Sequence, residues 1–215
     1  MPGRPAAARA AAPRGTRIRA GFAHGRSFRG GQGSAPPGAA APGSSVPALS
    51  LVIRPEHAAD GPGIARLHAR AFGPGRYART AYRLREGGAH RADLGVTASV
   101  GSFLAGSVRM NAVRAAAGPA FLALGPLAVD PSFAGRGIGS ALMRASLAAA
   151  AAAGEGLVIL VGDAPFYARF GFAPVGNGDL ELPGPVDPAR FLWFELAEGF
   201  RARVHGRVAA LPPGA

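Results

Sequence analysis

The sequence predicts a single mixed α/β (α+β) domain, and three observations lead to that fold class. Residues 124–154 run from an apolar strand through a glycine-dense turn into a helix-forming segment. Residues 157–161 are a continuous apolar run of the kind that forms a strand buried on both faces. Residues 94–100 alternate as a half-buried strand does. A chain of 215 residues has room for one such domain with a proper core, plus a tail.

The tail is the N-terminal leader, residues 1–50, in which alanine, proline, glycine and arginine alternate without helical or strand periodicity. It cannot bury enough apolar surface to offset its ordering entropy, so we expect it to be disordered. Its seven arginines and no acids leave the rest of the chain only mildly basic, although the whole chain carries a net charge of +12. A targeting segment, a misassigned translation start and an arginine arm for nucleic acid remain alternatives for the leader.

The first half of the domain is expected to place one strand, two helices and two further strands in order. Pro55 closes the first strand, and an apolar stripe at helical spacing follows it, on which we expect His68 to be packed rather than catalytic. Gly73-Pro74-Gly75 ends the first helix, and Gly101-Ser102 makes a turn between two strands. The expected elements are strands at 51–54, 94–100 and 103–113 and helices at 58–72 and 77–86.

The second half is organised around two long apolar strands and the helix between them. A strand at 120–129 ends at Asp130-Pro131, and a helix at 140–153 stops at Gly154, a natural C-cap. The strand at 157–161 follows. A closing pair at 172–175 and 190–196 and an edge strand at 204–210 complete the expected sheet.

Composition excludes several kinds of site. The chain has no cysteine, which removes thiolate nucleophiles and cysteine-based zinc sites. It also has no lysine, which removes Schiff-base chemistry and the phosphate loop of nucleotide hydrolases. No uninterrupted apolar run reaches the roughly 18 residues of a membrane helix. We therefore expect a soluble, cytoplasmic protein without a metal or a membrane partner.

The glycine turn between Asp130 and the helix has the chemistry of an anion cradle. Gly135, Gly137 and Gly139 let a ligand approach the backbone closely. The first amides of the helix have no internal partners, and the helix dipole is positive there. Together they favour a phosphate or pyrophosphate. The dinucleotide fingerprint fails in both glycine registers, because its last position falls on Ser140 or Leu142.

The run Ala134-Gly135-Arg136-Gly137-Ile138-Gly139 resembles motif A of the GNAT superfamily of acyl-CoA-dependent N-acyltransferases, of the bacterial predicted N-acetyltransferase type. Ala134 departs from that pattern, in which a glutamine or arginine is usual. The resemblance implies that residues 135–140, ending at Ser140, hold the pyrophosphate of acetyl-CoA. It also implies that unpaired backbone groups of Leu127, Ala128 and Val129 hold the pantetheine arm.

A second stretch, Tyr167-Ala168-Arg169-Phe170-Gly171-Phe172, is similar to the Tyr-x-x-x-Gly-Phe pattern of a short helix in the same superfamily. In that family the tyrosine is often the general acid for the CoA thiolate, and this implies that role for Tyr167. The alternative is a packing aromatic beside its phenylalanine neighbours.

The resemblance implies the GNAT fold, a mixed, mostly antiparallel sheet with helices on both faces and a splayed central strand pair. It places the N-acetyltransferase domain at residues 51–200 and leaves 201–215 as a C-terminal extension. The implied reaction moves an acetyl group from acetyl-CoA to a primary amine of a small molecule or peptide, by direct attack in a ternary complex. A CoA-binding domain without turnover is the alternative function, and a nucleic-acid partner is not expected.

Other points stay open at this stage. The general base is Asp130, Asp163 or a water relay. Asp179, Glu181 and Asp187 are interpreted as solvated loop charges, with attraction of a cationic amine as the alternative. The acceptor cannot be read from the sequence, and a homodimer remains an open alternative to a monomer.

Overall fold

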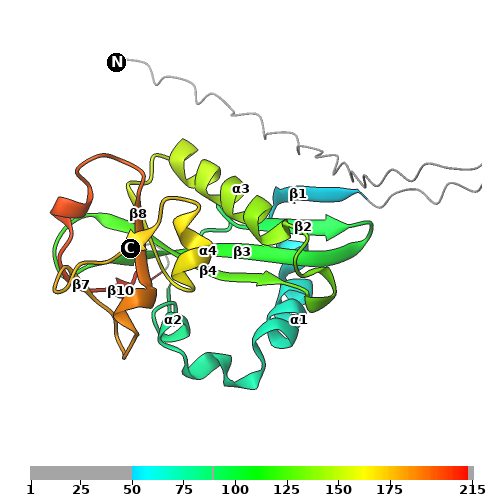
Figure 1. The fold of residues 1–215 in the computed structure, drawn as a ribbon, viewed down its shortest axis with the longest axis horizontal. Coiled ribbons are helices and arrows are strands. Elements are labelled where there is room, and N and C mark those ends of the chain that lie inside the picture. The colour runs from blue at the N-terminus through cyan, green and yellow to red at the C-terminus, as the bar shows by residue number, and fades with distance from the viewer. Residues whose placement is uncertain (1–49, 89, 213–215) are drawn as a thin grey trace, which may run out of the picture.

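The computed structural model describes residues 50–88 and 90–212 and builds them around one long twisted sheet (Figure 1). The leader prediction falls almost entirely outside these described residues. Along the sheet the strand order is β1-β2-β3-β4-β5-β8-β6, and β10 adds to the edge of β3. Every pair is antiparallel except β4 with β5, so the sheet is mixed and mostly antiparallel as predicted. The strands are β1 Leu51–Pro55, β2 Val96–Val100, β3 Phe103–Arg114, β4 Ala120–Val129, β5 Leu157–Val161, β6 Ala173–Pro174, β7 Leu180–Glu181, β8 Phe191–Glu195, β9 Gly206–Arg207 and β10 Ala209–Ala210.

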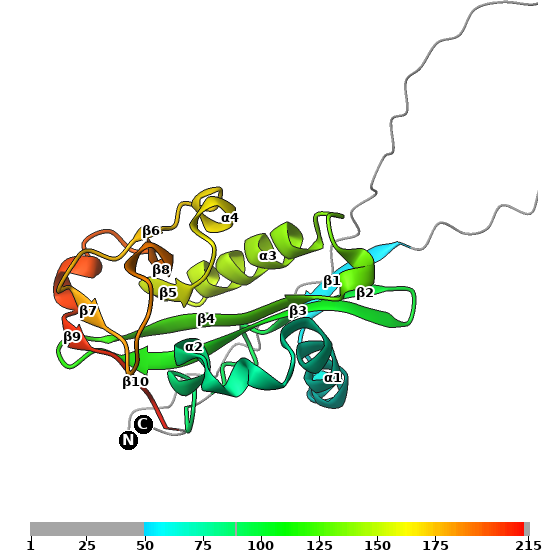
Figure 2. The same ribbon diagram turned by 60° about the horizontal axis from the view of Figure 1, so that its bottom comes forward.

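Helices cover both faces of this sheet. Figure 2 shows α1 (Gly61–Phe72) and α2 (Thr80–Arg83) on one face, and α3 (Ile138–Ala152) and α4 (Ala164–Ala168) on the other. The stripe on α1 is buried as expected and includes His68, which is 7% exposed and lies 3.2 Å from Ser107 Oγ through its Nε2. Gly154, just past α3, has the left-handed backbone (φ 77°) that suits a C-cap glycine.

The central pair of strands separates along its length. β4 pairs with β3 from Ala120 to Val129, but its recorded pairing with β5 is confined to Leu122–Val158 and Ala123–Ile159. Beyond that point, no strand of the described residues pairs with this edge of β4. The register of β3 against β4 also shifts between Val108 and Met110, opposite Gly125-Pro126, as a β-bulge does. The expected splayed pair is therefore present.

Three expected elements differ from the prediction. The helix at 77–86 is broken, because Arg79 has extended backbone (φ −75°, ψ 139°) between a 3₁₀ turn at Pro74–Ala78 and α2. A short helix is only marginally stable without tertiary support. Here the tertiary contact is a hydrogen bond that Thr80 Oγ1, just after the break, donates to Pro185 O at 2.6 Å. The strand at 172–175 shrinks to two residues, one of which is Pro174, a residue without an N–H to donate.

The third difference lies in the C-terminal extension. The expected edge strand at 204–210 divides into β9, which pairs with β7, and β10, which pairs with β3. Gly206 has a φ of 87°, and the segment turns there. Val204 and Val208 are fully buried in the core between these contacts, so the extension contributes to the packing of the domain.

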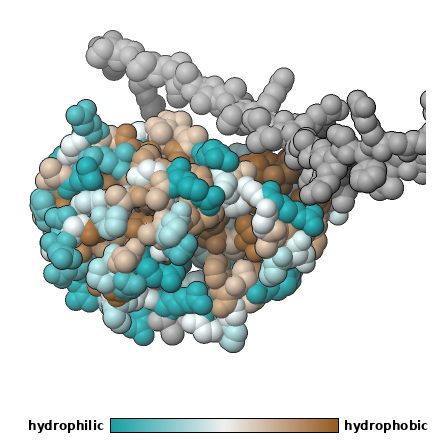
Figure 3. Space-filling view, in the orientation of Figure 1, coloured by the Kyte–Doolittle hydropathy of each residue, from teal (hydrophilic) through white to brown (hydrophobic). Residues whose placement is uncertain are grey.

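Figure 3 shows how polarity is distributed over one face of the domain. Hydrophilic residues dominate its left and lower edges, the end that carries β7 and α2, whereas hydrophobic residues gather toward β1 and β2. In the described part of the chain, no helix is both long and apolar enough to cross a membrane.

Candidate active site

The glycine turn leads directly from β4 into α3. The carboxylate of Asp130, buried at the end of β4, accepts hydrogen bonds from the Ser132 backbone N–H at 3.1 Å and from Arg70 Nε at 3.0 Å. A 3₁₀ turn at Pro131–Phe133 follows, and residues 134–137 are exposed. Asp130 thus fixes where the turn leaves the sheet.

The backbone of the turn has the open geometry that an anion cradle needs. Gly135 and Gly137 have φ values of 74° and 76°, and a Cβ added at either would meet nothing within 4 Å. Gly137 is the N-cap of α3, and its carbonyl accepts from the amide of Ala141 at 3.0 Å. The amides of Ile138, Gly139 and Ser140 precede that bond, in the first turn of a 15-residue helix.

α4 lies against the start of α3. A Cβ added at Gly139 would lie 3.6 Å from Phe166 Cζ and 3.7 Å from Val129 Cγ2. The glycine turn, the end of β4 and the helix that carries Tyr167 therefore meet at one place, although they are up to 38 residues apart in sequence.

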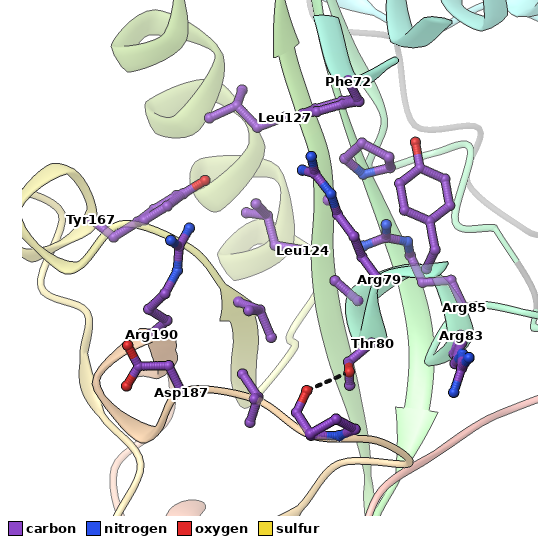
Figure 4. Close-up of a pocket in the computed structure, with 17 residues that line it drawn as sticks. Phe72, Arg79, Thr80, Arg83, Arg85, Leu124, Leu127, Tyr167, Asp187 and Arg190 are labelled. Carbon is purple, nitrogen blue, oxygen red and sulfur yellow. Dashed lines mark hydrogen bonds between the residues drawn. The ribbon is translucent and has the colours of Figure 1, made fainter. Parts of the chain in front are cut away.

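The ring of Tyr167 is held by aromatic neighbours and by a glycine. It packs edge-on against Phe166, with centroids 4.9 Å apart, and against Phe172 at 5.9 Å. Gly162 lies directly beneath the ring, because a Cβ there would be 2.2 Å from Tyr167 Cε2. Burial, reinforced by the charge of Asp163, raises the pKa of the phenol to about 12. The hydroxyl points into a pocket (Figure 4), and no protein hydrogen bond is recorded for it among the described residues.

That pocket opens where β4 and β5 part. Its volume is about 660 Å³, within the usual range for small-molecule sites. The β4 bulge, with Leu124 and Leu127, forms one wall, and Tyr167 and Val161 form another. α2 and the segment Pro185–Asp187 close it, joined by the hydrogen bond from Thr80 to Pro185 (Figure 4).

The polar lining of the pocket is mainly arginine, which sequence reasoning missed. Arg79, Arg83, Arg85 and Arg190 line it, with Asp187 as the one carboxylate among its lining residues. A signal was available, because residues 76–85 contain four arginines and no acid. These arginines could not be assigned to a site from the sequence, because only the fold shows which side chains of that segment line the pocket.

The structure sorts the predicted site residues into two groups. Leu127 and Tyr167 line the pocket, while Gly135, Arg136 and the start of α3 lie outside its lining. Ala128 and Val129 lie on β4 between these two groups, and Ala128 is buried. The guanidinium of Arg136, in the glycine turn, lies over the Phe133 ring.

The two carboxylates considered as general base do not reach the pocket. Asp130 is buried and paired with Arg70, and Asp163 is exposed at the N-cap of α4. Neither lines the pocket, whereas Asp187, interpreted as a solvated loop charge, does. Its exposed carboxylate accepts from the Ala189 amide at 3.0 Å. Among the described residues, no cluster of three or more histidine or acidic side chains could hold a metal ion.

Comparison with known proteins now identifies the family. Residues 97–174 match the model of the acetyltransferase (GNAT) domain. The uncharacterized N-acetyltransferase YhbS of Escherichia coli K12 is 30% identical over 159 residues, covering 74% of this chain and 95% of YhbS.

Two solved structures extend the comparison. The crystal structure of E. coli YhbS in complex with CoA has a TM-score of 0.64 at 30% identity, covering 78% of this chain and 93% of that one. A GNAT family acetyltransferase from Brucella melitensis, in complex with acetyl-CoA, is 26% identical with a TM-score of 0.49, covering 68% and 96%. With its mixed sheet, splayed strand pair and glycine turn, this chain is an acyltransferase that belongs to the GNAT family of N-acetyltransferases.

Proposed function

We propose that this enzyme transfers an acetyl group from acetyl-CoA to a primary amine of a small molecule or peptide, by direct attack in a ternary complex in the cytoplasm. The observation that carries the proposal is the parting of β4 from β5. Among the described residues, it leaves one edge of β4 without a paired strand between an open glycine turn and the hydroxyl of Tyr167. CoA in the E. coli YhbS structure supports acetyl-CoA as the co-substrate.

The backbone supplies the binding of acetyl-CoA in this proposal. The first amides of α3, together with the helix dipole, hold the pyrophosphate. The free edge of β4 at Leu127, Ala128 and Val129 offers N–H and C=O groups to the pantetheine arm, in the manner of an added strand. An amide of the same edge can stabilise the oxyanion that forms on the thioester carbonyl.

The proposed chemistry is a single displacement with a proton returned to sulfur. The amine nitrogen forms a bond to the thioester carbon, and the carbon–sulfur bond then breaks. Tyr167 donates its phenolic proton to the departing thiolate as general acid. The proton lost by the amine passes to Asp187, the one carboxylate of the pocket lining, or to water, and the phenolate regains a proton afterwards.

The arginines reduce the demand on a general base. Positive charges near a bound ammonium favour its neutral form, because like charges lower the pKa of the group. A primary amine in this pocket is therefore deprotonated more easily than the same amine in water.

The experiment compares two glycine variants of α3 that have matched geometry. Gly137 and Gly154 lie at opposite ends of the helix, have φ values of 76° and 77°, and have nothing within 4 Å of an added Cβ. Valine at either position imposes a similar left-handed strain, of about 1–2 kcal/mol. Only Gly137→Val alters the cradle.

We expect Gly137→Val to weaken acetyl-CoA binding at least about tenfold by calorimetry, which corresponds to about 1.4 kcal/mol. Gly154→Val should bind as the wild type does. Thiol release from acetyl-CoA with a panel of primary amines then tests turnover. Equal affinity in both variants would overturn the cradle, and binding without thiol release toward any amine would favour a CoA-binding domain without turnover.

A further inference from the structure

The pocket beside Tyr167 holds an excess of positive charge that the described residues do not neutralise with ion pairs. Four arginines and one carboxylate line it. None of Arg79, Arg83, Arg85 and Arg190 forms an ion pair with a carboxylate of residues 50–88 or 90–212.

Several arginines elsewhere in the domain do have such partners. Arg54 Nη1 lies 2.6 Å from Asp60 Oδ2, and Arg91 pairs with both Asp93 and Glu155. Arg109 pairs with Glu56, Nε to Oε2 at 3.0 Å. Arg66, Arg114 and Arg207 also have no ion pair among the described residues, so the pocket is distinguished by the four such arginines that gather around one cavity.

Arg85 is the most informative member of this set. Its guanidinium is partly buried, lies 4.9 Å from the centroid of the Tyr82 ring, and is close enough to β4 that a Cβ at Gly125 would be 3.0 Å from Nη1. Burial lowers the pKa of Arg85 to about 10, so the side chain is still charged at neutral pH. A charge withdrawn from water without a counter-charge is unfavourable, and an anion from a ligand would relieve that cost.

We infer that the acceptor amine also carries an anionic group, a carboxylate or a phosphate, which Arg85 and Arg79 bind while the amine faces Tyr167. Figure 4 shows Arg79 and Arg85 on the α2 side of the pocket, with Tyr167 and Arg190 across it. The planar guanidinium fork binds both kinds of oxyanion in bidentate fashion. This inference rests on the proposed function and adds the substrate class to it.

The phosphates of CoA do not account for these arginines. The expected pyrophosphate site is the start of α3, and none of residues 134–140 lines the pocket. α2 and α3 also cover opposite faces of the sheet (Figure 2). The arginines on and beside α2 therefore face the acceptor side.

A purely cationic amine does not fit the pocket either. Its ammonium would meet four guanidinium groups and a single exposed carboxylate, Asp187. Asp179 and Glu181, the other two acids of that loop, do not line the pocket. They therefore do not attract a cationic amine into it. An acceptor that carries both an amine and an anionic group places negative charge beside the arginines of the pocket.

The experiment uses acceptor pairs that differ only in the anion. Glycine, β-alanine and 4-aminobutyrate are compared with their amides, and phosphoethanolamine with ethanolamine, by thiol release at saturating acetyl-CoA. The variant is Arg85→Gln, which removes the charge and keeps a long polar side chain. Arg66→Gln is the control, because Arg66 is exposed on α1 and lies outside the pocket lining.

We expect the best anionic acceptor to exceed its neutral counterpart about 10- to 100-fold in kcat/KM, the usual value of a charge-assisted hydrogen bond. Arg85→Gln should remove most of that preference, because the anionic acceptors lose more activity than their neutral counterparts do. Arg66→Gln should retain it. A preference confined to the amino acids assigns a carboxylate, and one confined to phosphoethanolamine assigns a phosphate.

A second measurement does not depend on turnover. N-acetyl-β-alanine, N-acetyl-β-alaninamide and inorganic phosphate are titrated calorimetrically into the protein saturated with CoA. Selective binding of the two anions, lost in Arg85→Gln, supports the inference. Neutral amines used as well as anionic ones, or an equal loss for both in Arg85→Gln, would overturn it while leaving the proposed function intact. If acetyl-CoA binds but no amine releases thiol, the proposed function fails, and the titrations alone decide whether the pocket holds an anion.

Discussion

Replacing Tyr167 with phenylalanine removes one oxygen atom from the proposed chemistry and little else. The ring contacts to Phe166 and Phe172 and the seat on Gly162 involve carbon atoms only. No protein hydrogen bond of the hydroxyl is recorded among the described residues, so none is lost. We therefore expect the free energy of unfolding and the affinity for acetyl-CoA to stay within about 0.5 kcal/mol of wild type.

The cost of the proton transfer follows from the environment of the phenol. With the pKa of Tyr167 at about 12, and that of a thiol at about 8.5, the transfer is uphill by about 5 kcal/mol. Turnover of about one per second corresponds to a total barrier of about 17 kcal/mol, so the free-energy cost of this proton transfer is well below the total barrier. Burial of the leaving thiolate raises its pKa as well and narrows the gap.

Turnover of Tyr167→Phe should fall about 10²- to 10⁴-fold, the usual value of a positioned acid. The assay is thiol release at saturating acetyl-CoA, with slow hydrolysis of acetyl-CoA as the readout if no acceptor is known. In the proposed mechanism the neutral phenol is the active form, so the rate should show no loss due to Tyr167 until the pH approaches about 12. Turnover within a few-fold of wild type would show that the tyrosine is a packing residue and that water protonates the thiolate.

Two further predictions concern stability. Burial, followed by the charges of Arg109 and Arg85, lowers the pKa of His68 to about 4. The neutral form is therefore favoured in the folded state, and about 3 kcal/mol of stability present above pH 6.5 should be lost as the pH falls toward 4. Urea unfolding at pH 7 and pH 4 measures this, and an equal pH dependence in His68→Gln would refute it. Removing residues 1–48 should leave the melting temperature within a few degrees and the affinity for acetyl-CoA unchanged, because that composition offers no apolar face for packing; a larger drop by calorimetry would show that the leader docks on the domain.

The parts of the fold that the sequence predicts well are those with strong local signals. The apolar strands at 120–129 and 157–161 and the C-cap glycine after α3 are where the pattern places them. Hydrophobic periodicity and glycine conformation are properties of a few neighbouring residues, so they can be read without the fold. The glycine turn belongs to the same class.

The parts that failed depend on partners distant in sequence. Arg79 interrupts a helix that local propensity favours, next to a residue bonded 105 positions away, at Pro185. The charge of the pocket is likewise assembled from residues 79–85, on and beside α2, and from Arg190, which meet only once the sheet has formed. Neither contact leaves a periodic trace in the sequence.

Because the ring of Tyr167 packs on Gly162, substitutions at these two positions should be coupled among homologues. A Cβ at residue 162 would fall 2.2 Å from the ring, so even alanine there would force the ring or the backbone of residue 162 to move. The reverse dependence is weaker, because a smaller residue at 167 would leave room for a side chain at 162. Homologues that keep the tyrosine should therefore keep glycine five residues before it, and those that lose the glycine should have lost the tyrosine first. The order in which the two residues are lost among homologous sequences therefore tests whether the position of the Tyr167 ring depends on Gly162.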